Sequence, residues 1–170
     1  MTELLLVRHG ETDWNREHRV QGHTDVPLNA RGREQARALA EDVADVRLAA
    51  VYASDLSRAR ETAAAVATAQ ALEVVVDPRL REKNFGSWEG LTDVEIAERF
   101  PDAVRGRWGD GETTEDVAAR AIEALEVICA RHRDAAVLVV SHGGPLRAIL
   151  SHLAVEHGPI RNCQVFRVEH

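Results

Sequence analysis

Short runs of apolar residues recur along the chain and are separated by longer segments with a different apolar pattern. The runs cover residues 4–7, 49–53, 74–76, 136–140 and 165–168. Their length and their content of aliphatic and β-branched residues are typical of strands that are buried in a sheet. The hydrophobic pattern therefore predicts five strands.

Between these runs, apolar residues recur at the three- and four-residue spacing of helices. Asn29 is a suitable N-cap for one helix, and a Thr92–Glu95 capping box opens a shorter helix that Pro101 ends. Further helices are expected from about residue 56, over residues 117–129 and after Pro145, whereas segments 10–28, 78–90 and 101–112 are expected to be loops or irregular. Alternating strands and helices predict an α/β fold with a mostly parallel sheet.

Composition places the chain among ordinary folded proteins. Its 170 residues suffice for one domain, residues 1–170, and 45% are hydrophobic while 29% are charged, which argues against disorder. The net charge of −7 argues against nucleic-acid and membrane partners. Without a signal-like N-terminus or a membrane-length apolar stretch, we expect a cytoplasmic protein, with Cys129 and Cys163 as buried thiols.

Two predicted strands end in a histidine, in the sequences Arg8-His9-Gly10 and Ser141-His142-Gly143. In parallel sheets, ligands bind beyond the carboxyl ends of the strands. The second sequence also opens a helix with glycines, whose free N–H groups favour an anion, and either Arg58 or Arg60 could reach the same cleft. These groups suit a phosphate dianion, with His9 as a candidate covalent acceptor. No acidic cluster suggests magnesium, so we expect neither a metal nor another cofactor.

Longer motifs extend this pattern over nearly the whole chain. Residues 6–15, Leu-Val-Arg-His-Gly-Glu-Thr-Asp-Trp-Asn, closely resemble the signature of the histidine phosphatase superfamily in its phosphoglycerate-mutase-like branch. The resemblance continues in order through residues 19–22, 27–29, 32–36, 54–63, 80–82, 85–90 and 140–143. It implies a three-layer α/β/α fold and a phosphatase that acts on small-molecule phosphate esters.

The resemblance also implies roles for individual residues. His9 resembles the nucleophile that becomes phosphohistidine, and Glu82 resembles the proton donor to the leaving group. Arg58, rather than Arg60, stands where the family pattern has its arginine. The group that holds the phosphoryl oxygens is implied to be Arg8, Arg58 and His142, and the residues that line the substrate pocket are implied to be Thr12, Asn15, Gln21, Gly22 and Gly143.

Other functions remain open at this point. A phosphoglycerate mutase dependent on 2,3-bisphosphoglycerate would share the site, but the short connection over residues 100–113 and the end of the chain after the last strand favour a phosphatase. A protein-phosphohistidine phosphatase fits the length, although motifs 11–15 and 85–90 look more like the small-molecule branch. A non-catalytic binding domain disagrees with the intact motifs. The substrate stays open among α-ribazole phosphate, sugar phosphates, phosphoglycerate derivatives and a broad range of phosphate monoesters. The short 101–113 segment favours an open pocket and broad specificity.

Several of the single residues also have an interpretation without any catalytic or metal-binding role. Outside its motif, Glu82 would be read as a surface carboxylate beside Arg81 and Lys83. His152 has no partner at metal-ligand spacing, which argues against zinc. The remaining histidines are expected to lie at the surface: His18, His23, His132, His157 and His170.

Overall fold

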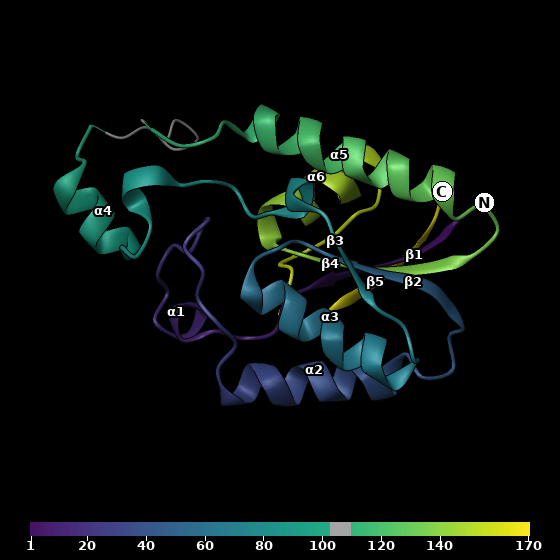
Figure 1. Ribbon diagram of the computed structural model, residues 1–170. Helices are drawn as coiled ribbons and strands as arrows, with labels where there is room; N and C mark the ends of the chain where they lie inside the picture. Colours follow the sequence, from purple (N-terminus) through teal and green to yellow (C-terminus); the bar gives the residue numbers. More distant parts are fainter. Residues whose placement is uncertain (103–109) are drawn as a thin grey trace.

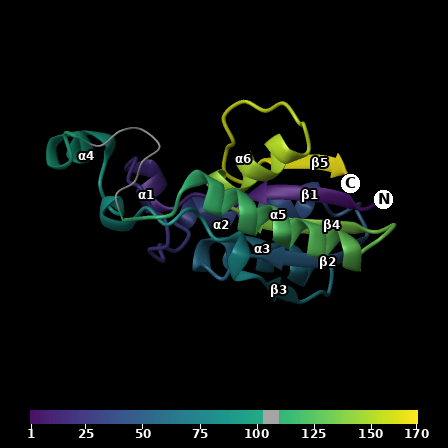
Figure 2. The same cartoon turned by 90° about the horizontal axis from the view of Figure 1, so that it is seen from above.

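The computed structural model describes residues 1–102 and 110–170. Five strands form one sheet in the order β3-β2-β4-β1-β5, and Figure 2 shows β3 and β5 at its opposite edges. Strands β1 to β4 run parallel, and β5 pairs with β1 in the antiparallel sense. The strands are β1 (Glu3–Arg8), β2 (Leu48–Ala53), β3 (Val74–Val76), β4 (Ala136–Ser141) and β5 (Val165–Glu169).

Helices cover both faces of the sheet (Figure 1). Helices α2 (Ala30–Asp42) and α3 (Ser57–Ala69) pack on one face, and α5 (Thr114–Arg131) and α6 (Gly143–His152) pack on the other. Alternate side chains of β1 serve the two cores: Leu4 and Leu6 face α5 and α6, whereas Leu5 and Val7 face α2 and α3. The strands are apolar without interruption because both of their faces are buried. The predicted three-layer α/β/α fold is confirmed.

The segments predicted as irregular contain short helices that the apolar pattern did not reveal. Helix α1 (Asp13–Arg16) lies in the expected loop 10–28, where Thr12 and Asn15 cap each other's backbone N–H groups. Two 3-10 turns, η1 (Pro78–Leu80) and η2 (Gly86–Trp88), lie in segment 78–90. These elements are too short to show a hydrophobic period in the sequence. Most of the 101–113 segment, residues 103–109, lies outside the described residues.

The parallel strands all end on the side of the molecule that carries α1 and α4 (Asp93–Arg99), away from both chain termini (Figure 1). At this end, α4 packs with η2 and the following loop around Trp88, Leu91 and Ile96. Within the described ranges, no helix combines the length and the apolar content that crossing a membrane requires. The strand ends that carry the predicted site therefore lie on the same side of the molecule as α1 and α4.

Candidate active site

The two strand-end histidines lie side by side. Strands β1 and β4 are neighbours, and their register pairs Arg8 with Ser141, so the residues that follow, His9 and His142, leave the sheet together. Their ring centroids are 5.0 Å apart, and both side chains are buried. His142 is also the N-cap residue of α6. Parallel pairing thus converts two distant sequence motifs into one site.

A backbone hydrogen bond fixes the tautomer of His9. Its Nδ1 lies 2.7 Å from the carbonyl oxygen of Gly10, which can only accept, so Nδ1 carries the proton. The other ring nitrogen, Nε2, is then bare and can attack an electrophile. Two further contacts hold this turn: Asn162 donates to the His9 carbonyl at 2.8 Å, and the Gly10 N–H donates to Thr62 Oγ1 at 2.9 Å.

Burial and positive charge keep both histidines neutral. Desolvation lowers the pKa of His9 well below 6.5, and the nearby guanidinium groups of Arg58 and Arg8 lower it further, although the Gly10 carbonyl opposes them. The pKa of His142 is lowered well below 6.5 for the same reasons, burial first and Arg58 second. His9 is therefore in its nucleophilic form at neutral pH.

These pKa shifts predict a loss of stability in acid. In the unfolded chain the histidine pKa is near 6.5, whereas in the folded protein the pKa values of His9 and His142 are well below it. Below pH 6.5 the unfolded state therefore binds more protons than the folded state, and the free energy of unfolding falls as the pH drops. Each histidine contributes a slope of up to about 1.4 kcal/mol per pH unit. Urea unfolding from neutral pH down to about pH 5 measures this slope.

Two variants separate this effect from general acid denaturation. His142→Gln should flatten the slope, whereas His18→Gln, at an exposed position, should leave it unchanged. An unaltered slope in His142→Gln would show that this histidine is not held neutral by the fold.

Arg58, at the start of α3, is fully buried. It donates hydrogen bonds to the carbonyl oxygens of Gly22 at 2.7 Å and Thr24 at 3.0 Å. Desolvation lowers its pKa to about 10, which leaves it charged at neutral pH. Arg60 is exposed, so of the two arginines that follow β2 the structure brings Arg58 into the site.

Polar atoms without partners concentrate at this site. Arg8 donates through Nη1 to the Ile160 carbonyl at 2.7 Å, but its Nε has no partner. Among the described residues, the buried side-chain atoms that lack a hydrogen bond are Arg8 Nε, Arg58 Nε, His142 Nδ1 and Ser57 Oγ. Buried polar groups are normally satisfied, and each such exception needs an explanation. Three of the four belong to residues predicted to hold phosphoryl oxygens, which can accept several N–H donors at once.

The Glu82 carboxylate contacts the first turn of α6. Its Oε1 accepts hydrogen bonds from the N–H groups of Lys83 at 2.8 Å and Gly144 at 3.0 Å, whereas Oε2 has only a 3.4 Å contact with Gly144. Burial lowers the pKa of both Arg8 and Arg58, and the nearby charge of Glu82 partly offsets this effect in each. Glu82 is therefore part of the site and not an isolated surface carboxylate.

The predicted pocket-lining residues are positioned in different ways. Thr12 and Gln21 are buried and bond each other at 2.8 Å, so both side chains serve the loop that carries them. The Asn15 side chain accepts a hydrogen bond from the Thr12 N–H and so completes the N-terminal cap of α1. Gly22 has a φ of +55°, where a side chain would also collide with Glu89, and its carbonyl binds Arg58. Gly143 is buried at the first position of α6.

Several residues that the motifs did not single out also contribute to the site. Ser54, at the end of β2, shares a 2.7 Å hydrogen bond with His142 Nε2. Thr62 supports the turn after His9. Both belong to the quoted motif at residues 54–63, so that signal was present. His23, expected at the surface, is only partly exposed, with 28% of its side chain accessible, and its Nε2 lies 2.9 Å from the Glu82 carbonyl oxygen. Cys129 is buried as expected, but Cys163 is only partly so.

Metal ligands do not gather in this region. Over residues 1–102 and 110–170, no group of three or more histidine, cysteine, aspartate or glutamate side chains is arranged to hold a metal ion. The positive charge near His9 comes from Arg8 and Arg58 instead.

Comparison with known proteins places this geometry in a family. Residues 4–170 match the model of the histidine phosphatase superfamily, branch 1. Among curated proteins, the chain is 43% identical over 160 residues to a metal-independent phosphoserine phosphatase of Arabidopsis thaliana, covering 88% of this chain and 67% of the relative. It is 36% identical over 184 aligned positions to a probable phosphoglycerate mutase GpmB of Enterobacter sp. (strain 638), covering 100% of this chain and 86% of the relative.

The fold comparison agrees. The structure of Bacillus stearothermophilus YhfR superposes with a TM-score of 0.91 at 37% identity and covers 99% of this chain and 91% of that one. The chain therefore belongs to branch 1 of the histidine phosphatase superfamily, which confirms the family and the phosphatase class of enzyme predicted from its sequence.

Proposed function

We propose that this protein is a metal-independent phosphomonoesterase that hydrolyses small-molecule phosphate esters through a phosphohistidine on His9. The observation that carries the proposal is the set of unpartnered nitrogen atoms on Arg8, Arg58 and His142, three residues that lie near a neutral His9 whose Nε2 is bare. A phosphoryl group would satisfy these atoms and present its phosphorus to the nucleophile.

In the first step, His9 Nε2 attacks phosphorus while the bond from phosphorus to the ester oxygen breaks. Nδ1 keeps its proton, which remains hydrogen-bonded to the Gly10 carbonyl oxygen. The leaving oxygen takes a proton from Glu82, for which Oε2 is the suitable atom because Oε1 is already held by two backbone N–H groups. Arg8 and Arg58 stabilise the charge on the transferred oxygens.

In the second step, water attacks phosphorus and the bond to Nε2 breaks. The Glu82 carboxylate, now without its proton, accepts one from the water, which restores the enzyme and releases phosphate. Histidine returns as the neutral tautomer because Nδ1 has kept its proton throughout.

The relatives indicate which substrates deserve testing first. The name of the Arabidopsis relative supports phosphoserine, and that of the Enterobacter relative makes phosphoglycerate mutase the main competing activity. A mutase returns the phosphoryl group to a second ester, whereas a phosphatase gives it to water. Phosphate release from a panel of metabolites, with and without 2,3-bisphosphoglycerate, separates the two. Turnover that requires 2,3-bisphosphoglycerate and releases no phosphate would contradict the proposal.

Activity should survive removal of divalent metals. Arg8 and Arg58 lie close enough to His9 to lower its pKa, so they supply the positive charge that metal ions supply in many phosphoryl-transfer sites. Phosphoserine hydrolysis after dialysis against EDTA should equal that of the untreated enzyme. Loss of activity that magnesium or zinc restores would contradict metal independence.

A further inference from the structure

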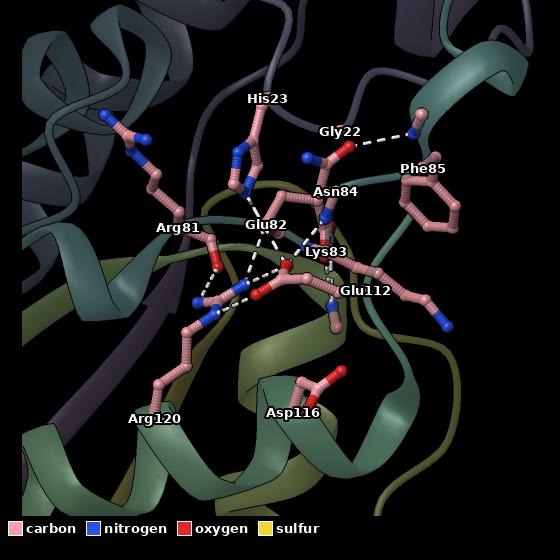
Figure 3. A network of polar contacts seen from close by, with 12 residues as sticks. Gly22, His23, Arg81, Glu82, Lys83, Asn84, Phe85, Glu112, Asp116 and Arg120 are labelled. Atoms are coloured by element: carbon pink, nitrogen blue, oxygen red, sulfur yellow. Dashed lines mark hydrogen bonds and ion pairs between the residues drawn. The ribbon is translucent and has the colours of Figure 1, made fainter. Parts of the chain in front are cut away.

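Arg120, on α5, uses its whole guanidinium group to hold the segment that carries Glu82. Nη1 donates to the carbonyl oxygens of Arg79 at 2.7 Å and Arg81 at 2.6 Å, and Nη2 donates to the Glu82 carbonyl at 2.8 Å. Nε and the second Nη2 hydrogen bind the two carboxylate oxygens of Glu112, each at 2.8 Å. All five N–H donors of the arginine are thus engaged. Figure 3 shows Arg120 reaching toward Arg81, Glu82 and Glu112.

Glu112 completes this arrangement from the other side of the segment. While its carboxylate orients the guanidinium, it also accepts the Asn84 N–H at 2.8 Å, and its own N–H donates to the Asn84 carbonyl at 2.9 Å. His23 adds a second hydrogen bond to the Glu82 carbonyl. Both the Arg120 and Glu112 side chains are mostly buried, with 18% and 23% of their surface exposed.

The segment that carries Glu82 lacks the regular backbone hydrogen bonds of a helix or strand, so contacts from other elements must hold it. It leaves the 3-10 turn η1 after Leu80, so the carbonyls of Arg81 and Glu82 belong to neither a helix nor a strand. Within residues 1–102 and 110–170, the Glu82 carboxylate accepts hydrogen bonds from the backbone N–H groups of Lys83 and Gly144. The position of the Glu82 backbone relative to α6 therefore determines whether its carboxylate can reach the Gly144 N–H.

We propose that Arg120, oriented by Glu112, is a positioning residue that holds Glu82 where it can protonate the leaving group; this rests on the proposed role of Glu82 as proton donor. Arg120 binds backbone carbonyls, and its effect on the reaction passes through Glu82. Three carbonyls and a carboxylate require the planar fork of arginine, so lysine cannot replace it although it keeps the charge.

The test compares two esters. Arg120→Lys should slow phosphorylation of the enzyme by phosphoserine, whose alkoxide leaving group needs a proton, by roughly 10- to 100-fold, since a small misplacement of a catalytic group has about this effect. Phosphorylation by nitrophenyl phosphate, whose phenolate leaves without help, should change by less than about threefold. Both rates are measured as the burst of phosphoenzyme.

A double variant tests whether the effect passes through Glu82. In a Glu82→Gln background, Arg120→Lys should add almost nothing to the loss with phosphoserine, because the group it positions can no longer donate a proton. Arg79→Gln is the matched control: its guanidinium lies on the same segment but pairs with Asp77 and Glu123, so it should not discriminate between the esters. Should Arg120→Lys fail to fold, Glu112→Gln, which keeps one oxygen for the Asn84 N–H, should show a smaller loss with the same selectivity.

The outcomes separate this inference from the proposed function. If Glu82→Gln slows only phosphoserine whereas Arg120→Lys and Glu112→Gln slow both esters equally, Arg120 serves general folding and the inference alone is wrong. Additive losses in the double variant would also overturn it. If Glu82→Gln itself slows both esters equally, the proton-donor role fails and the inference fails with it.

Discussion

Replacement of His9 by alanine is expected to reduce phosphatase turnover by on the order of 10⁴-fold or more, as removal of a covalent nucleophile does in other enzymes. Because Nδ1 of His9 carries the proton, its Nε2 is bare, and the guanidinium groups of Arg58 and Arg8 lie close enough to lower its pKa. His142 is neutral too, but Ser54 occupies its Nε2. The rate of phosphate release from phosphoserine at saturating substrate measures the loss.

Two controls show whether the loss of activity in His9→Ala arises from the missing nucleophile and not from misfolding. Its far-ultraviolet spectrum and thermal unfolding should show that the sheet is intact. The matched variant His152→Ala, at an exposed histidine on α6, should retain full activity. Substantial turnover by a folded His9→Ala variant would mean that another group, or water itself, attacks phosphorus.

Glu82→Gln is expected to slow cleavage of alkyl phosphates by roughly 10²- to 10⁴-fold, the usual contribution of general acid catalysis. Glutamine can still accept the N–H groups of Lys83 and Gly144, so the side chain should stay in place while its acidic proton is lost. Nitrophenyl phosphate should be affected far less, measured as the phosphorylation burst because later hydrolysis of phosphohistidine also uses Glu82.

The comparison of leaving groups decides what Glu82 does. Equal slowing of the burst for both esters would assign Glu82 to binding or orienting the phosphate. Glu115→Gln, at an exposed position in the first turn of α5, serves as the control for a change of surface charge and should leave both rates unchanged.

The central layers of the fold were predictable because burial on both faces gives each inner strand an uninterrupted apolar run. His9 and His142 could be placed together because each follows a predicted strand, and parallel strands end at the same edge of the sheet. The choice of Arg58 over Arg60 came from the motif, and the structure supplies its cause. Residues two positions apart point to different sides of a helix, so Arg58 turns inward while Arg60 meets solvent.

Contacts between distant segments could not be read from the sequence. The Arg120 fork closes on carbonyls about forty residues earlier in the chain, and no local pattern marks a side chain whose partners are backbone atoms. His23 shares this difficulty, because its partner is the Glu82 carbonyl and not a side chain. Helix α1 was missed since its cap pairs Thr12 with Asn15, where capping boxes usually have glutamate or glutamine.

Rapid quenching of the wild-type enzyme during turnover of labelled substrate tests the phosphohistidine mechanism most directly. Covalent catalysis at His9 predicts a burst of protein-bound phosphate that is stable in alkali and is lost in acid. The label should map to the peptide containing His9 and be absent from His9→Ala. Turnover without any bound phosphate, or label on a different residue, would contradict covalent catalysis at His9.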